Sequence, residues 1–312
     1  MRLNRFFPAV LAVCALVAST GSSAQTAQLK MPGFPAPGAP PAVTVSSTGA
    51  APKKALRYVI PSGQKATMDI TVNMGMSMNL AGMAMPMDMP GMKMTADAEV
   101  TKVDPNGDIT YTLAFTGLTV DATPGTNPAV AAAFQGAAAN ITSMKGTTTI
   151  SNRGVTKSAK MDIGDPTMQQ MLGQMTSTIE NLSNPFPEEA VGVGAKWEVR
   201  QALTSGGQTS FTKTEYEVVA LDGDTVTLKM KMEQTAPPQS VSNPALPPGT
   251  EVSLEKLVGS GTGTTKINLN SLVPSVEMNS TISTAMVMSM GGASQPVTSD
   301  MTLKMIIAPA KK

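Results

Sequence analysis

A methionine cluster between Met74 and Met94 holds the side chains of this chain best suited to chemistry. Nine of the 21 residues in this stretch are methionine. A thioether is a flexible apolar group that fills irregular gaps. It is also a soft ligand that favours Cu(I). The cluster therefore indicates either apolar contact or metal binding. Its members are Met74, Met76, Met78, Met83, Met85, Met87, Met89, Met92 and Met94.

Five of these methionines fit the alternation of two half-buried strands. Apolar residues occupy every second position from Met68 to Leu80, and again from Met92 to Val100. Because successive residues of a strand point to opposite faces, the methionines of each strand share one face. We expect the five to line an apolar sheet face that binds a ligand. They are Met74, Met76, Met78, Met92 and Met94.

The other four methionines lie between Gly82 and Pro90, with Pro86 among them. Proline interrupts strand pairing, so this stretch is predicted to be a hairpin loop or the edge of a sheet. Loops are normally solvated, and thioethers in a loop need a further explanation. Either the loop covers the sheet as an apolar lid that contacts the ligand, or it binds Cu(I). The four are Met83, Met85, Met87 and Met89.

The spacings M-x-M and M-x-x-M resemble Met-rich segments of bacterial periplasmic copper-handling proteins. The resemblance implies that Met83, Met85, Met87 and Met89 hold Cu(I), with Asp88 as a further ligand. Those segments frequently include histidine, which this chain lacks. Copper is therefore the alternative hypothesis, and the apolar-contact hypothesis needs no cofactor.

The same alternation predicts a mainly β fold. Asp104-Pro105-Asn106-Gly107 has the composition of a turn and leads into another strand, residues 108–118. Two short helices are predicted, one from Pro128 to Ala139 and one from about Pro166 to Leu182. We expect strongly curved antiparallel sheets, or an open barrel, built from two related strand meanders.

The predicted meanders rest on short motifs that recur in the same order. Gly63-Gln64-Lys65 corresponds to Gly194-Ala195-Lys196. The hairpin that ends in Asn106-Gly107-Asp108 corresponds to the one that ends in Asp222-Gly223-Asp224. These matches, with a third between the Gly-Thr strands at residues 146–150 and 263–267, predict repeat units of residues 55–164 and 190–308.

The N-terminal stretch indicates export. Residues 1–24 have the charged, apolar and small-residue regions of a signal peptide, with cleavage near Ala24. Residues 25–54 are rich in Pro, Ala and Gly and are predicted to be a disordered linker before a β-rich domain of residues 55–312. No later apolar run is long enough for a transmembrane segment. We therefore expect a periplasmic or secreted protein.

Composition argues against catalysis and against nucleic acid. The chain has no histidine, and its one cysteine, Cys14, lies in the predicted signal peptide, so the commonest general base and every cysteine nucleophile are missing from the mature chain. Without the two signal arginines, 21 basic residues face 22 acidic ones, a net charge of −1. The Gly-rich stretch from Gly259 to Gly263 lacks the lysine of a phosphate-binding loop and is predicted to be a strand edge or bulge. We expect no enzyme.

The signal, the Pro-rich lead, the G-x-K strand openings and the D-x-N-G-D hairpin together resemble uncharacterised secreted bacterial β-sheet proteins. The expected architecture also resembles periplasmic lipoprotein-carrier folds, which implies a curved sheet with an apolar concavity. Three hypotheses follow. The first is a non-enzymatic binding protein for an apolar small molecule or an apolar segment of an envelope protein. The second is a Cu(I)-binding protein, and the third is a structural or interaction module of the cell envelope.

Overall fold

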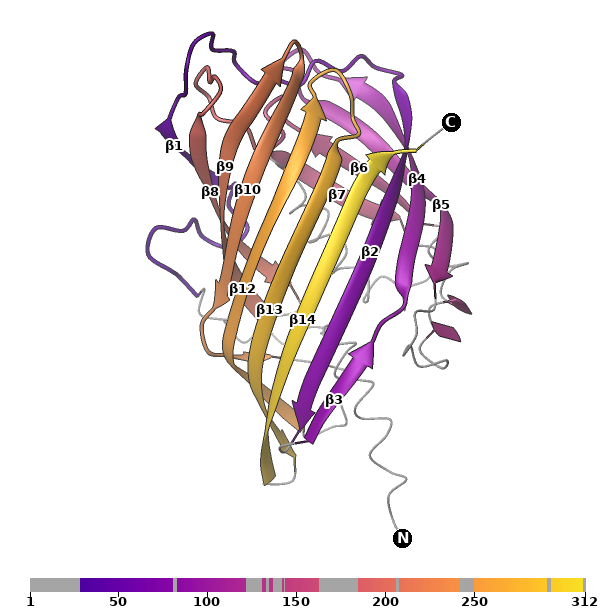
Figure 1. The fold of residues 1–312 in the computed structure, drawn as a ribbon, viewed down its shortest axis with the longest axis vertical. Helices are drawn as coiled ribbons and strands as arrows, with labels where there is room; N and C mark the ends of the chain where they lie inside the picture. The colour runs from indigo at the N-terminus through magenta and orange to yellow at the C-terminus, as the bar shows by residue number, and fades with distance from the viewer. Residues whose placement is uncertain are drawn as a thin grey trace.

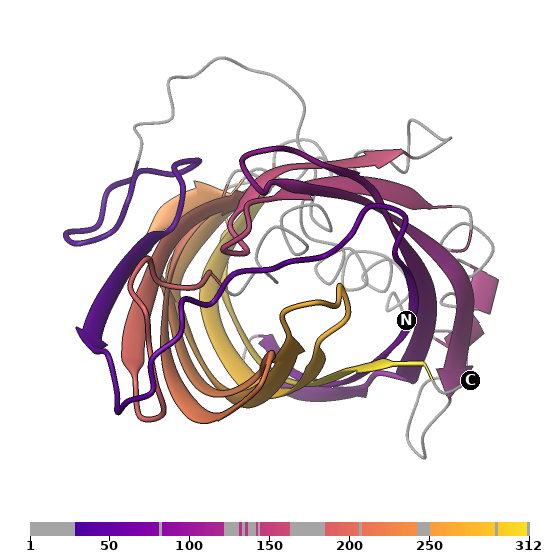
Figure 2. The ribbon, with the colours of Figure 1, turned by 90° about the horizontal axis from the view of Figure 1, so that it is seen from above.

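Fourteen strands form one antiparallel sheet that curves strongly and does not close (Figures 1 and 2). The computed structural model describes residues 29–80, 83–121, 131–132, 135–136, 142, 144–162, 185–205, 208–241, 250–290 and 293–310. The predicted signal peptide lies outside these residues. The mainly β, curved antiparallel fold is thus confirmed.

The strands differ greatly in length, and the longest run from one end of the sheet to the other. They are β1 (Ala42–Ser47), β2 (Lys65–Leu80), β3 (Met83–Asp88), β4 (Gly91–Val103), β5 (Ile109–Asp121), β6 (Lys145–Ile150), β7 (Thr156–Asp162), β8 (Lys196–Ser205), β9 (Gln208–Asp222), β10 (Thr225–Ala236), β11 (Gln239–Val241), β12 (Thr250–Asn268), β13 (Ser275–Met290) and β14 (Ala293–Pro309).

The sheet order places two meanders side by side. The order is β1-β8-β9-β10-β12-β13-β14-β2-β4-β5-β6-β7, with β3 on β2 and β11 on β12. The segment β2-β4-β5-β6-β7 and the segment β8-β9-β10-β12-β13 therefore have the same course, and β14 joins them. A duplicated origin for the two segments stays a prediction.

Equivalent contacts open the two segments. The N–H of Gly63 donates to the carbonyl of Val100 at 2.7 Å, and the N–H of Gly194 donates to that of Val218 at 2.8 Å. Both glycines have a φ of 81°, in the left-handed region that suits glycine. At the first residue of each following strand, Lys65 of β2 pairs with Glu99 at 3.3 Å and Lys196 of β8 pairs with Glu217 at 3.5 Å.

Ordered structure begins earlier than the sequence predicted. Residues 42–47, within the predicted disordered linker, form β1 and pair antiparallel with β8. Val43 and Val45 alternate with polar residues and pack against the core of the sheet, so this short segment does bury apolar surface. Upstream of β1, the Phe34 ring lies 5.3 Å from that of Phe211 on the outer face. The linker prediction is wrong for these residues.

The predicted loop of Met83 to Met89 is mostly a strand. Met83–Asp88 forms β3, which pairs with β2 and lies at the free edge of the sheet there. The edge alternative is therefore confirmed and the loop is wrong. Pro86 is tolerated because an edge strand has one side without ladder partners.

Neither predicted helix can be compared with the structure. The first is described only at residues 131–132 and 135–136, and the second lies outside the described residues. Within the described part of the chain, no helix is long and apolar enough to cross a membrane.

The largest cluster of buried side chains lies at one end of the concave face. Two segments, residues 54–62 and 185–195, cross this end and are here called the end plug (Figure 2). Leu56 and Phe186 of the plug are fully buried against Trp197 and Leu228 of the sheet. The plug closes the upper end of the concave face in the view of Figure 1.

A turn aspartate stabilises the β4–β5 connection. The Asp108 carboxylate, 13% exposed, accepts hydrogen bonds from the Lys157 ammonium and from the Asn106 amide at 2.9 Å. The hydrogen bond from Lys157 holds the pKa of Asp108 below its usual range, which outweighs the opposite effect of burial.

We expect Asp108→Asn to lower the free energy of unfolding at neutral pH by about 1–3 kcal/mol. A carboxyl whose folded pKa is depressed stabilises the fold above its unfolded pKa of about 3.9. That contribution is lost as the pH falls through the folded pKa. Urea unfolding should therefore show a difference at pH 7 that disappears in acid. An equal difference at both pH values, or the same effect from Asp222→Asn at an exposed position, would contradict this account.

Candidate functional site

A band of methionines crosses the concave face of the sheet below the end plug. Directly paired residues of neighbouring strands lie on the same face, so the strand register defines this band. We call it the methionine face. Its members are Met74, Met76, Met78, Met92, Met94, Met230, Met232, Met278, Met301 and Met305.

Three register rows build the methionine face. The row nearest the plug runs from β9 to β4 as Tyr216, Met230, Gly263, Met278, Met305, Val72 and Met92. The second row, from β10 to β2, is Met232, Gly261, Ser280, Leu303 and Met74. The third row is Gln234, Gly259, Ile282, Met301, Met76 and Met87.

Most methionines of this face are only half-buried. Met78, with 4% exposed, is buried, whereas the other members keep part of their surface accessible. A methionine side chain is unbranched and rotates about three bonds, so such a surface can repack around ligands of different shape.

Glycines of β12 make room on this face. Gly259, Gly261 and Gly263 occupy one position in each row, in the middle of the sheet. A Cβ at Gly263 would lie 2.7 Å from the terminal methyl carbon of Met230, which therefore lies across that glycine. The predicted strand edge or bulge at this stretch is wrong: β12 is paired on both sides there, and its bulge falls at Glu255.

The predicted site residues divide by strand register. Met83 and Met85 pair with Leu80 and Met78, and Met87 pairs with Met76. Met89 follows β3 and does not join them. Between β3 and β4, the three residues Met89 to Gly91 lie opposite only two residues of β2. The extra residue shifts the positions that face the concave side from odd to even residue numbers.

Two hollows lie on the opposite, outer face of the sheet. Their volumes are about 840 and 740 Å³, and Lys231, Thr262 and Asn279 line both. Met89 lines the second hollow. The outer face here presents hydroxyl, amide and charged groups, so it does not resemble the apolar site that the methionine pattern predicts.

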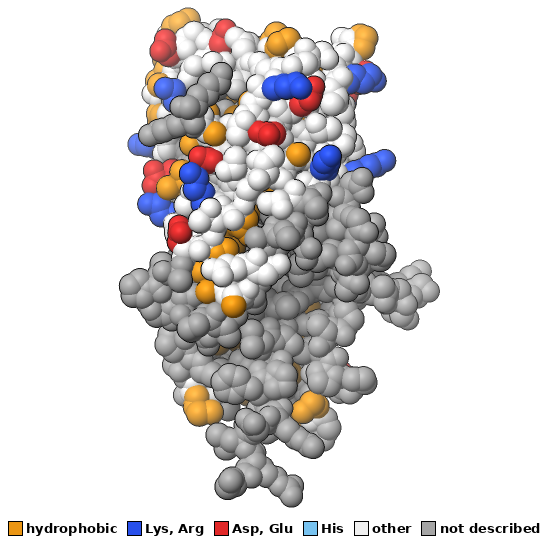
Figure 3. All heavy atoms as spheres, turned by 90° about the vertical axis from the view of Figure 1, so that its right-hand side faces the viewer, with side chains coloured by type: hydrophobic (Ala, Val, Ile, Leu, Met, Phe, Trp, Pro, Cys, Tyr) orange, Lys and Arg blue, Asp and Glu red, His pale blue; other side chains and the backbone are white. Residues whose placement is uncertain are grey.

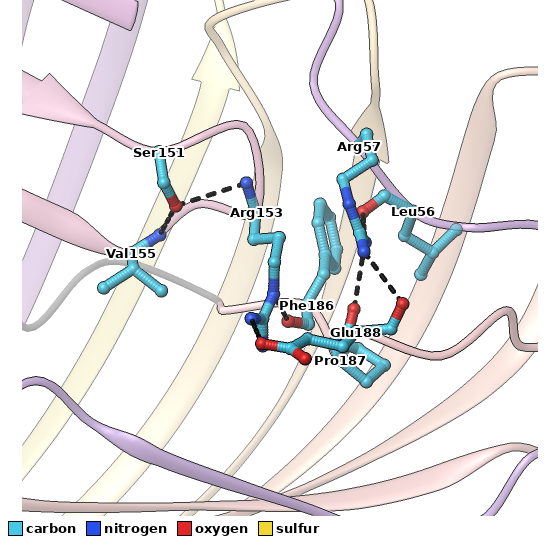
Figure 4. Close-up of polar contacts among 8 residues, drawn as sticks. All are labelled: Leu56, Arg57, Ser151, Arg153, Val155, Phe186, Pro187 and Glu188. Atoms are coloured by element: carbon cyan, nitrogen blue, oxygen red, sulfur yellow. Dashed lines mark hydrogen bonds and ion pairs between the residues drawn. The ribbon is translucent and has the colours of Figure 1, made fainter. Parts of the chain in front are cut away.

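Arg57 joins the two segments of the end plug, and Arg153, between β6 and β7, joins the plug to the sheet (Figure 4). Arg57 donates to the carbonyls of Pro187 at 2.9 Å and Glu188 at 2.8 Å. Arg153 donates to the carbonyl of Phe186 at 2.9 Å and pairs with the Glu188 carboxylate at 2.6 Å. These bonds satisfy backbone groups of a segment that would otherwise cover the core with unpaired carbonyls.

The three tyrosines of the chain lie at the plug end. Tyr58 of the plug packs with Tyr216 in one core cluster and with Tyr111 in another. Burial raises the pKa of each phenol, and for Tyr58 the nearby Tyr111 and Tyr216 raise it further. All three are therefore neutral at physiological pH.

Sequence reasoning missed half of the methionine face as a site. Met230, Met232, Met301 and Met305 show the same alternation, but nothing in the sequence places β14 beside β2, or β10 in the same sheet as β2. Among the described residues, no group of three or more Asp or Glu side chains is arranged to hold a metal ion.

The fold and this face define an open, curved antiparallel-sheet protein whose concave side is sealed at one end and lined with methionine. The chain belongs to DUF6263, a family of unknown function, whose model matches residues 71–272 of 312. No curated protein matches the chain. A search of solved structures gives the deltaS2 mutant of the TodX monoaromatic hydrocarbon channel, at 8% identity, 86% coverage of this chain and 96% of that one. Its TM-score of 0.14 carries no argument about fold or function.

We expect Arg57→Met to loosen the end plug and lower the free energy of unfolding by about 2–3 kcal/mol. The readout is Trp197, the one tryptophan of the chain, whose indole N–H donates to the carbonyl of Pro185 at 3.1 Å. Its emission should shift to the red at lower urea concentration than in the wild type. Lys53→Met, at an exposed position of the preceding segment, is the control. Equal effects of the two substitutions would contradict the role of Arg57.

Proposed function

We propose that this is an exported, non-enzymatic protein that binds an apolar, lipid-like molecule on the methionine face. The observation that carries the proposal is the set of three in-register rows, in which thioether and aliphatic side chains lie beside the glycines of β12. Ligand sites are concave and mainly apolar, and the methionine face has both properties. The predicted signal peptide, with periplasmic or secreted location, is part of the proposal.

The shape of the concave face supports a ligand that enters from one end. The end plug covers the upper part of the face, where Phe186 and Leu56 fill the space against the sheet. Below it, Met232, Met301 and Met74 are half-buried. An elongated apolar molecule would lie along the strands with its innermost part toward the plug.

The proposal predicts that Met301→Gln/Met305→Gln weakens binding of a fluorescent long-chain fatty acid about tenfold or more, because a polar amide replaces a thioether of similar size. The affinity is measured by fluorescence titration. Thr302→Gln/Lys304→Gln is the matched control, since these neighbours on β14 point to the outer face. Binding unchanged in the methionine variant, or weakened equally in both, would contradict the proposal.

Cu(I) binding is the second candidate, and one observation favours it. Met87, Met76 and Met301 are successive register partners on β3, β2 and β14, and Met85 pairs with Met78 in the next row. Cross-strand partners have Cβ atoms about 4.5–5.5 Å apart, which lets thioethers of three strands approach one ion. The site would thus lie across strands instead of within one loop.

This candidate predicts that Cu(I) binds the purified protein and that Met76→Leu/Met301→Leu weakens it about tenfold or more. Titration against a competing Cu(I) chelator measures the affinity. Replacing Met83, Met85, Met87 and Met89 with leucine should abolish binding. Affinity that survives both sets of substitutions would remove the copper hypothesis, while leucine would leave fatty-acid binding in place.

A further inference from the structure

Charged residues are distributed unevenly along the long axis of the sheet. Residues 70–87 and 278–299 contain no Lys, Arg, Asp or Glu. At the opposite end, the β4–β5 connection carries Asp104 and Asp108, and the β9–β10 connection carries Asp222 and Asp224. On the side of the molecule shown in Figure 3, the described surface of the upper half carries charged side chains of both signs.

The two charge-free stretches are neighbours in space. They form most of β13, the first part of β14, most of β2 and nearly all of β3, and β14 pairs directly with β2. Their hairpins both point to the lower end in Figure 1, away from the end plug. The last β14–β2 pair is Val297 with Leu80, so the β13–β14 hairpin extends beyond β2. We call these two hairpins together the lower end.

The lower end exposes a methionine at the tip of each hairpin. Met83 is 67% exposed and Met290 is 52% exposed. Each stands beside a connection of two small residues, Ala81-Gly82 or Gly291-Gly292. Glu251, Glu255 and Lys256 of β12 flank the lower end, so its uncharged surface is centred on the four strands β13, β14, β2 and β3.

We propose that the lower end docks on the neutral surface of a lipid membrane, with Met83 and Met290 inserted among the lipids. Moving charged groups toward hydrocarbon is costly, and exposed apolar side chains without charges around them fit the interface. Because the lower end carries no basic cluster, the contact depends on apolar insertion and not on anionic lipid. By register, Met83 and Met290 lie on the concave side of the sheet, beyond the three rows of the methionine face. The lower end therefore adds a partner to the proposed function.

The test is flotation of the purified protein with phosphatidylcholine vesicles at low and high salt. The wild-type protein should float at both, since apolar insertion is little affected by ionic screening. Met83→Asp/Met290→Asp should reduce the bound fraction about tenfold. Val59→Asp/Val193→Asp is the control: both valines are exposed, at 68% and 46%, but lie in the end plug.

Several results would overturn the proposal: no flotation of the wild type, flotation only with anionic vesicles at low salt, unchanged flotation of the methionine variant, or equal loss in the valine control. If the wild-type protein does not bind vesicles but forms a dimer, and the methionine substitutions dissociate that dimer, the lower end is instead an interface between two copies of the chain. Trp197 emission checks the fold, and Met83→Gln/Met290→Gln serves if the aspartates unfold the protein. Fatty-acid binding without vesicles should survive the substitutions, so failure of docking and failure of the proposed function are distinguishable.

Discussion

The structure depends on the register of its long strands, which determines the residues of neighbouring strands that are paired. A strand repeats every two residues, and a slip of one residue would move every methionine of that strand from the concave face to the outer one. The pairs of Met230 with Gly263, of Gly263 with Met278 and of Met278 with Met305 keep one row in phase across four strands. The change of phase between Met87 and Met92 is absorbed by the three residues before β4. Where the register changes, the extra residue is placed so that the inward methionines stay inward.

An open curved sheet must also cover part of its concave face, and within the described residues the end plug does so at the upper end. Buried aromatic and aliphatic side chains fill the upper part, and Arg57 and Arg153 satisfy the carbonyls of the segment that covers them. The other end has uncharged hairpins with exposed methionines. This asymmetry gives the concave face a sealed end, close to the charged turns, and an end suited to apolar contact. The proposed function would thus place stability and binding in different parts of one sheet.

Local alternation was enough to predict the strands from Met68 to Leu80 and from Met92 to Val100, and the turn after Asp104. It was not enough to predict which strands are neighbours, because pairing between β14 and β2 joins residues more than 200 positions apart. For that reason Met301 and Met305 could be seen as apolar but not as part of the site. Proline made two strands hard to predict. Pro86 left a hairpin loop and an edge strand as alternatives, of which the edge strand is confirmed, and the prolines before Ala42 obscured the short alternation of β1. In both cases the strand lies at an edge, where the sheet requires fewer hydrogen bonds.

The central claim is that the methionine face is a binding surface. The most direct measurement is NMR of protein labelled with carbon-13 at the methionine methyl groups, titrated with a long-chain fatty acid. The account predicts shifts at the methyl groups of Met74, Met76, Met232, Met301 and Met305, on three different strands, with one common affinity. Shifts confined to the exposed Met83 and Met290, or no saturable shift at any methionine, would contradict it.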